Sequence, residues 1–260
     1  MRRPERVMLP DGGHLVVARG GVGPALLALH GFSLDHRVWR PMAPALEADF
    51  SLIAPDLRGF GAASLPQGVY AHTDDLIALL DALELPRVVV MGLSMGGGVA
   101  VDFALEHPGR VAAVIVVDGT LGGFRGTLDW RVKTEGCTLR ESIAAWLAHP
   151  LFAWPRRDPQ VAAALDEITA DYSGWHWRQR DPQRRPARRA AERLSELDVP
   201  LLALVGEHDL PDFHAVALKL AAEVPGARHA MLAGIGHLPP LETPADTAAR
   251  VIDFARVALG

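Results

Sequence analysis

The 260-residue chain holds a single cysteine, Cys137, so it cannot form an internal disulfide, and nothing in it indicates a secreted, oxidised protein. Cys137 lies in a polar stretch without an adjacent basic residue, which favours an inert thiol over a nucleophile. Long apolar runs are missing too. Val111–Val117, among the longest, falls far short of the ~20 residues that cross a bilayer. No apolar segment of signal-peptide length follows the basic N-terminus. We therefore expect a cytoplasmic protein that does not associate with membranes.

An excess of positive charge and the common cofactor motifs are also absent. The net charge is -5, whereas binding to nucleic acid usually needs a basic face, so no nucleic-acid partner is expected. No Gly-x-Gly-x-x-Gly opens a dinucleotide-binding unit and no His-Glu-x-x-His marks a zinc helix, so we expect neither a cofactor nor a metal. The segment from His72 to Asp75 offers possible metal ligands. A helix N-cap at Thr73, with acids in the first turn, explains it more simply.

What the chain does contain is an alternation of short apolar runs and helical stretches. Residues 6–9 and 14–18 flank a Pro-Asp-Gly-Gly turn and predict a hairpin. Further strands are expected at residues 25–29, 50–54, 87–91, 111–117, 201–205 and 228–232, and helices at residues 39–48, 73–83, 95–106, 213–223 and 245–259. This order predicts an α/β fold whose mostly parallel central sheet has helices on both faces. In such a fold the ligand site lies at the carboxyl ends of the strands.

The alternation stops in the middle of the chain. Residues 119–197 show helical segments without a clear strand and carry five of the six tryptophans. We interpret them as a mainly helical cap, or lid, inserted into a core domain formed by residues 1–118 and 198–260. Aromatic side chains over a site can wall an apolar substrate pocket, although each of them could instead pack the cap onto the core. The candidates for this pocket are Trp130, Trp154, Trp175 and Trp177.

The motif Gly-Leu-Ser-Met-Gly, centred on Ser94, follows one predicted strand directly and begins a helix. A serine on such a tight strand-to-helix turn has a strained backbone, and the flanking glycines let neighbouring backbone pass close by. The helix N-terminus would add oriented N–H groups and a positive dipole end. We therefore expect Ser94 to be a nucleophile that projects into the cleft, rather than part of a glycine-rich packing turn.

A serine hydroxyl is a weak nucleophile at neutral pH and needs a base from another loop. His237 fits this role because it ends the segment Gly-Ile-Gly-His between the last predicted strand and the last helix. His107 and His149 have poorer contexts, since each precedes a proline and the second lies inside the predicted cap. Position and chain order thus favour His237 as the general base.

The third member should be a carboxylate after another strand and between the serine and the histidine. Asp209 follows the strand at residues 201–205 and would hold the imidazole in the right tautomer. Glu207 and Asp212 are close rivals, but Asp212 is better interpreted as the N-cap of the helix near Phe213. Asp118 also follows a strand and remains a rival for the acid.

Two donors must stabilise the oxyanion that forms when a serine attacks a carbonyl. The backbone N–H of Met95, at the start of the helix, is one candidate, and the N–H of Phe32, in the loop after the strand at residues 25–29, is the other. His30, in the same loop, is expected to brace it through hydrogen bonds rather than to act directly.

Together these residues resemble the α/β-hydrolase superfamily over nearly all of the chain outside the predicted cap. The serine motif matches the nucleophile elbow, and Asp209 and His237 match the acid and base in order. The loop from Asp56 to Gly61 resembles the family's Asp-x-Arg-Gly-x-Gly, although the usual following serine is Ala63 here. Within the superfamily, the elbow and the Leu-Glu after His237 are most similar to small esterases and 3-oxoadipate enol-lactonase-like hydrolases.

The resemblance implies an α/β-hydrolase fold and a serine hydrolase that cleaves a carboxylic ester or lactone through an acyl-enzyme. A small to medium, largely apolar molecule is the expected substrate. A carbon–carbon bond hydrolase with the same triad, or a small-molecule receptor on this fold, stays open as an alternative. The arginines between residues 178 and 193 form either a solvated, ion-paired face or a rim that attracts an anionic substrate.

Overall fold

The computed structural model describes residues 1–130 and 134–260. One sheet of eight strands runs through it in the order β1-β2-β4-β3-β5-β6-β7-β8. The predicted hairpin is present, and it pairs antiparallel with the rest of the sheet through β2 and β4. All the other neighbouring strands are parallel. The strands are β1 (Glu5–Met8), β2 (His14–Gly20), β3 (Ala25–Leu29), β4 (Ser51–Asp56), β5 (Val88–Leu93), β6 (Val111–Val117), β7 (Leu201–Gly206) and β8 (Arg228–Leu232).

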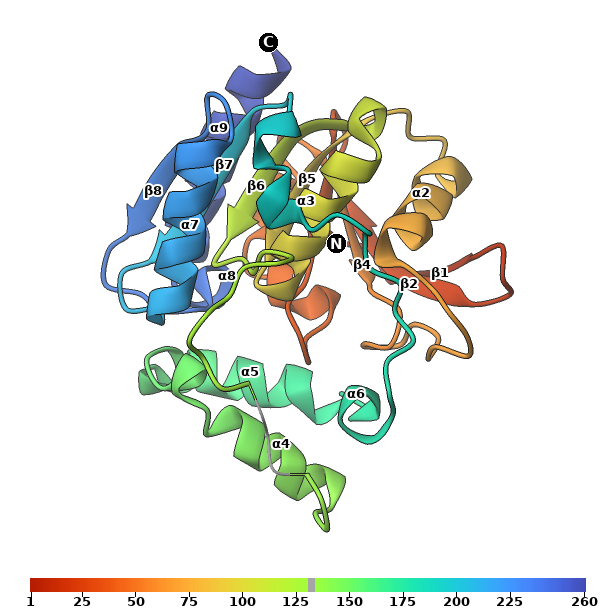
Figure 1. The fold of residues 1–260 in the computed structure, drawn as a ribbon, viewed down its shortest axis with the longest axis vertical. Coiled ribbons are helices and arrows are strands. Elements are labelled where there is room, and N and C mark those ends of the chain that lie inside the picture. The colour runs from red at the N-terminus through yellow and green to blue at the C-terminus, as the bar shows by residue number, and fades with distance from the viewer. Residues whose placement is uncertain (131–133) are drawn as a thin grey trace.

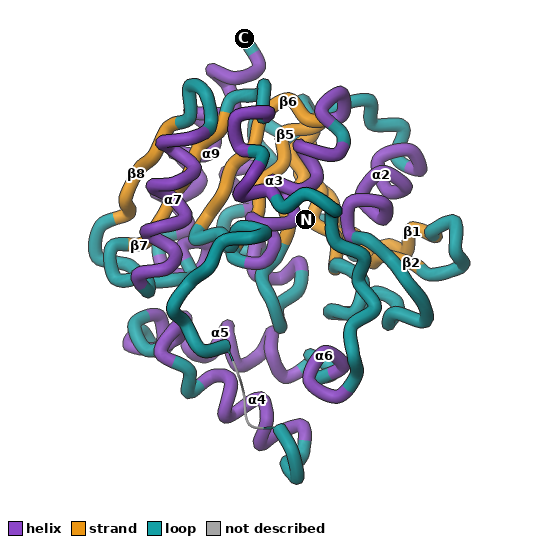
Figure 2. Tube along the Cα trace, in the orientation of Figure 1, coloured by secondary structure: helices purple, strands orange, loops and turns teal. Residues whose placement is uncertain are grey.

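Helices cover both faces of the sheet, which confirms the expected α/β fold (Figure 1). Helices α2, α3 and α7 lie in front of the sheet in Figure 2, whereas α9 lies behind it and packs on β6 and on α1. The core helices are α1 (Ala43–Leu46), α2 (His72–Ala82), α3 (Met95–Glu106), α7 (Pro211–Glu223), α8 (Pro239–Glu242) and α9 (Pro244–Leu259). Every residue of β5 and β6 is buried, as continuous Val-rich runs between two helical layers should be.

Between β6 and β7 the described chain forms helices and turns and contributes no strand to the sheet. Its helices, α4 (Leu139–Leu147), α5 (Pro159–Ala170) and α6 (Trp175–Arg178), lie below the carboxyl ends of the strands in Figure 1. A capping box between Thr138 and Glu141 begins α4, and Asp158 caps α5. The interpretation of residues 119–197 as a cap, with those boundaries, stays a prediction.

Three local predictions were wrong. Residues 39–48 do not form one helix, because a 3₁₀ turn at His36–Trp39 is separated from the short α1. Thr73 is not an N-cap, since α2 starts at His72 and its N-cap is Ala71. Asp212 is not an N-cap either. It lies inside the first turn of α7, and its carboxylate accepts hydrogen bonds from the backbone of residues 127 and 128.

None of the described helices is both long and apolar enough to cross a bilayer.

Candidate active site

Ser94 lies on a sharp turn between β5 and α3, with φ 53° and ψ -116°. A non-glycine residue in this region of φ and ψ is strained. The glycines on either side are required by close backbone contacts. A Cβ on Gly92 would lie 2.1 Å from the carbonyl oxygen of Gly96, and one on Gly96 would lie 2.2 Å from that of Leu29. The sequence motif therefore corresponds to a turn that only glycines permit, with Ser94 at its tip.

His237 and Asp209 form a buried hydrogen-bonded pair at the adjacent strand ends. The Nδ1 atom of His237 lies 2.8 Å from Oδ2 of Asp209, and the two side chains are 2% and 0% exposed. The other oxygen of Asp209 accepts a 2.7 Å hydrogen bond from the backbone N–H of Leu210. Asp209 thus accepts two N–H groups, which stabilise its carboxylate form and fix the imidazole so that Nε2 is free of the proton.

Burial acts on both members of this pair. It lowers the pKa of His237 to about 4, so the imidazole is neutral near pH 7 and able to accept a proton. Burial also raises the pKa of Asp209 to about 7, while the hydrogen bond from the Leu210 N–H acts in the opposite direction. Since the pair titrates together, we assign the negative charge at neutral pH to Asp209, which has the donors.

Ser94 and His237 line the same cavity, which has a volume of about 520 Å³. Within the described chain, no hydrogen bond joins the Ser94 hydroxyl to the imidazole. Such bonds are often long in unliganded hydrolases and tighten when substrate binds. The cavity thus brings together the candidate nucleophile and the candidate base.

Phe32 and Met95 also line this cavity. Met95 is the first residue of α3, so its N–H has no partner within the helix. The hydrogen bonds of the described chain include none from the Phe32 N–H. His30 braces the same loop as expected: Nε2 accepts from the Leu57 N–H at 2.9 Å, so Nδ1 carries the proton and donates to the Gly31 carbonyl at 2.8 Å. Both residues of the candidate oxyanion pair therefore border the cavity beside the serine.

Aromatic side chains form much of the cavity wall. Of the four tryptophans predicted to line it, Trp130 and Trp177 do so, and Trp154 and Trp175 do not. Trp154 instead stacks on His208 at 3.5 Å and donates to the Gly234 carbonyl, so it packs against the loop that carries His237. The sequence marks the insertion as rich in tryptophan but gives no signal for the direction in which each ring points.

Trp146 is a lining residue that was not among those candidates. It is 4% exposed, and its Nε1 donates a 2.7 Å hydrogen bond to the hydroxyl of Ser33, next to the candidate oxyanion loop. Its ring packs edge-to-face on Phe32. The amphipathic pattern of α4 predicts that Trp146 is buried, but it does not predict which residues Trp146 contacts.

The rivals for the acid have other contacts. Glu207 accepts a 2.8 Å hydrogen bond from the Gly234 backbone and so ties two loops together. Asp212 binds the backbone of the segment after β6. Asp118 is the exception, because it is buried next to the Asp209–His237 pair and its Oδ1 accepts from the Gly206 N–H.

Three of the seven arginines in the described segment 178–193 form ion pairs. Arg184 pairs with Asp74, and Arg188 and Arg193 pair with Glu196. These pairs agree with the solvated-face interpretation. Arg185 differs, because it lines the cavity together with Ser94.

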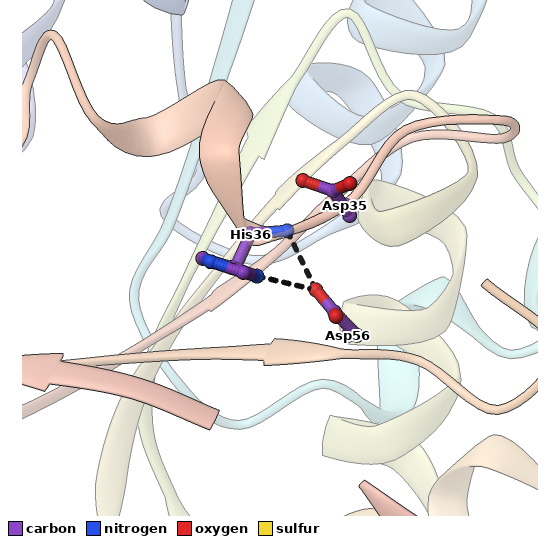
Figure 3. A group of neighbouring side chains, drawn as sticks. All are labelled: Asp35, His36 and Asp56. Carbon is purple, nitrogen blue, oxygen red and sulfur yellow. Dashed lines mark hydrogen bonds and ion pairs between the residues drawn. The ribbon is translucent and has the colours of Figure 1, made fainter. Parts of the chain in front are cut away.

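Two groups in the described part of the chain hold His and carboxylate atoms close enough to bind an ion. Figure 3 shows the first, Asp35, His36 and Asp56. Both the N–H and Nδ1 of His36 contact Oδ1 of Asp56, whose Oδ2 accepts from the Ala62 N–H, and Asp35 pairs with Arg37. These hydrogen bonds account for the carboxylates, so we infer no metal site there. The second group is Asp118, Asp209 and His237.

A strained serine after a central strand, and a buried His–Asp pair from later loops, define a hydrolase-type site on an α/β scaffold. The chain belongs to the α/β hydrolase fold family, whose model matches residues 24–244.

Three relatives are similar over nearly the whole chain. Carboxylesterase YbfK of Bacillus subtilis is 24% identical over 93% of this chain and 83% of its own. The enol-lactonase of Burkholderia xenovorans LB400 has a TM-score of 0.82 and 25% identity, covering 97% of this chain and all of its own. Est816, described as an N-acyl homoserine lactone degrading enzyme, has a TM-score of 0.79 and 26% identity, covering 96% and 100%. The chain also matches proteins of Mycobacterium bovis and Mycobacterium tuberculosis. The match spans only 39% of the length of these relatives.

Proposed function

We propose that the chain is a serine hydrolase that cleaves a carboxylic ester or lactone through an acyl-enzyme. The observation that carries this proposal is that one cavity is bordered by the strained Ser94 and by His237, whose imidazole is hydrogen-bonded to the buried Asp209. Relatives named as a carboxylesterase, an enol-lactonase and a lactone-degrading enzyme support this class of bond.

In the proposed reaction, Oγ of Ser94 attacks the carbonyl carbon and its proton passes to Nε2 of His237. The C–O bond to the alcohol then breaks, His237 returns the proton to the alcohol oxygen, and the acyl group stays on Ser94. Water attacks the acyl-enzyme, with His237 again taking a proton. Release of the carboxylic acid restores the Ser94 hydroxyl, so water is the only co-reactant.

The other residues have supporting roles in this scheme. Asp209 holds the imidazole and stabilises the imidazolium that forms in each half-reaction. The backbone N–H groups of Phe32 and Met95 stabilise the oxyanion, and the loss of one such donor typically costs ~10²–10³ in kcat. The position of Phe32 on the wall of the cavity beside Ser94 supports its assignment to this role.

The proposed substrate is small to medium in size and largely apolar. A cavity of about 520 Å³ suits a ligand of that size, and its wall includes Phe32, Trp130, Trp146, Phe152 and Trp177. We further propose that the helices inserted between β6 and β7 act as a cap that excludes water from the acyl-enzyme. Long-chain triglycerides would then be poor substrates.

Hydrolysis of p-nitrophenyl esters of increasing acyl length tests the proposal directly. Wild type should turn over short esters, and Ser94→Ala should lose nearly all activity. Ser51→Ala is the matched control, since Ser51 begins β4 and so lies at the amino end of a strand, away from the carboxyl ends where the site is. Equal activity of wild type and Ser94→Ala would remove Ser94 from the mechanism. Inactivity of both, with tight ligand binding, would indicate a receptor instead.

A further inference from the structure

Asp118 is a buried carboxyl that the proposed mechanism does not use. It follows β6 directly, has a positive φ of 43° and is 1% exposed. Its own N–H donates to the Leu204 carbonyl at 2.9 Å, and its Oδ1 accepts from the Gly206 N–H at 2.8 Å. The residue is therefore anchored to β7 from both its backbone and its side chain, just before the loop that carries Asp209.

The second oxygen of Asp118 decides its protonation state. Oδ2 is buried and has no donor directed at it in the described chain. One side-chain oxygen or nitrogen from each of Asp118, Asp209 and His237 lies within 4.8 Å of the other two. An ionised Asp118 would leave a buried oxygen unsatisfied next to a second carboxylate, and both conditions are costly. A protonated Asp118 removes both costs, because its Oδ2–H can donate to Asp209.

The hydrogen bonds of the pair determine which carboxyl holds the proton. Asp209 accepts from the Leu210 N–H and from His237, which favours its ionised form, whereas Asp118 accepts from one N–H only. Burial, together with the charge of Asp209, raises the pKa of Asp118 well above its ordinary value.

We propose that Asp118 is a positioning residue, a neutral carboxylic acid whose Oδ2–H donates a hydrogen bond to the Asp209 carboxylate. The two carboxyls thereby share one proton and carry one negative charge. The Asp209 carboxylate then accepts hydrogen bonds from both Asp118 and His237, which hold it against the imidazole. This inference rests on the proposed function only in taking Asp209 as the acid of the triad.

Glu242 of α8 is a further ionisable group near this cluster. Its carboxylate accepts from the Gly236 and Leu238 N–H groups, and its charge acts on Asp209 and His237. The groups that act directly on Asp118 are Asp209 and His237. Substitutions at position 118 therefore report on the two-carboxyl pair.

Difference infrared spectroscopy tests the protonation state without any assay of activity. At about pH 8, wild type should show the carbonyl stretch of a buried protonated carboxyl, and Asp118→Asn should lack it. Asp102→Asn is the control. Asp102 is also partly buried, but its pKa is raised only to about 6, so it is ionised at that pH and its removal should leave the band in place. Identical spectra of wild type and Asp118→Asn would overturn the inference.

Two substitutions at position 118 test the positioning role. In Asp118→Asn the amide can donate to Asp209 and accept from Gly206, so kcat should stay close to wild type. Asp118→Gly accepts the positive φ but makes neither hydrogen bond. Its kcat should fall roughly 10- to 100-fold at unchanged KM, as expected when a hydrogen bond to a charged group is lost.

These outcomes separate the inference from the proposed function. If the asparagine variant loses as much kcat as the glycine variant, or if the glycine variant equals wild type, Asp118 has no positioning role, whereas ester hydrolysis still stands. If no ester is hydrolysed by any variant but the infrared band behaves as described, the shared proton stands and the proposed function fails.

Discussion

The Nδ1 atom of His237 lies 2.8 Å from Oδ2 of Asp209, although the two residues come from different loops. The parallel pairing of β7 and β8 sets this distance, and it extends past the strand ends. Beyond the Gly206–Leu232 pair, the Glu207 N–H still donates to the Leu232 carbonyl. The His237–Asp209 pair is therefore held both by the sheet and by hydrogen bonds between the two loops, such as that from the His208 N–H to the Ile235 carbonyl.

We expect Asp209→Asn to lower kcat about 10³- to 10⁴-fold, because an amide at this position favours the wrong tautomer of His237. Activity on a p-nitrophenyl ester is the measurement. Glu207→Gln is the matched control, because Glu207 contacts the Gly234 backbone and His208, and it should stay within a few-fold of wild type. A larger loss at Glu207 than at Asp209 would reverse the assignment of the acid.

The pH dependence of kcat/KM should have its acid limb below the ordinary histidine pKa of about 6.5. Burial lowers the pKa of His237 to about 4, so the imidazole takes up its proton, and ceases to be a base, only as the pH falls toward that value. Activity should rise with pH through the limb and then level off.

A second variant tests whether a nearby negative charge shifts the pKa of His237 in the expected direction. The charge of Glu242 raises the pKa of His237, so Glu242→Gln should move the acid limb to still lower pH. A midpoint near 7 would instead indicate that protonation of Asp209, whose pKa burial raises to about 7, controls the activity.

Much of this site could be predicted from the sequence because its signals are local. The turn around Ser94 is encoded by adjacent glycines between an apolar run and a helix. His237 and Asp209 follow from chain order and from their places after strands. The mostly parallel pairing of the strands likewise follows from the alternation of apolar runs with helices, whereas their order in the sheet was not predicted.

The predictions that failed depend on long-range partners. Asp212 has the features of a cap, but its carboxylate binds backbone N–H groups 84 and 85 residues away. Thr73 resembles a cap, yet the helix begins one residue before it, with Asp75 paired to Arg58. In the described chain no donor is directed at Oδ2 of Asp118. This depends on which groups the fold places around it, and no spacing in the sequence shows it.

Gly96→Ala should destabilise the fold, since its Cβ would lie 2.2 Å from the backbone oxygen of Leu29, which cannot move aside cheaply. Overpacking of this kind costs about 1–3 kcal/mol or more, a fall in Tm of at least ~2–4 °C for a chain of this size. Gly109→Ala is the control, because nothing lies within 4 Å of its Cβ. Equal Tm values for the two variants would show that the turn at Ser94 tolerates a side chain.

Arg185→Gln tests the rim interpretation of the arginine segment. Arg185 lines the cavity, so the variant should lower kcat/KM for an anionic ester, such as a p-nitrophenyl hemisuccinate, about two- to fivefold, the effect of an exposed ion pair of ~0.5–1 kcal/mol. A neutral ester of similar length should be unaffected. Arg184→Gln, whose arginine pairs with Asp74 on the surface, is the control. Equal effects of both variants would favour a purely solvated face.

The most direct test of the central claim is to trap the covalent intermediate. A fluorophosphonate should react with wild type in a ratio of one to one, and mass spectrometry of the digested protein should find the adduct on Ser94. His237→Ala should react far more slowly, because the serine then lacks its base. A wild-type protein that stays unlabelled, or one labelled at another residue such as Cys137, would contradict the account.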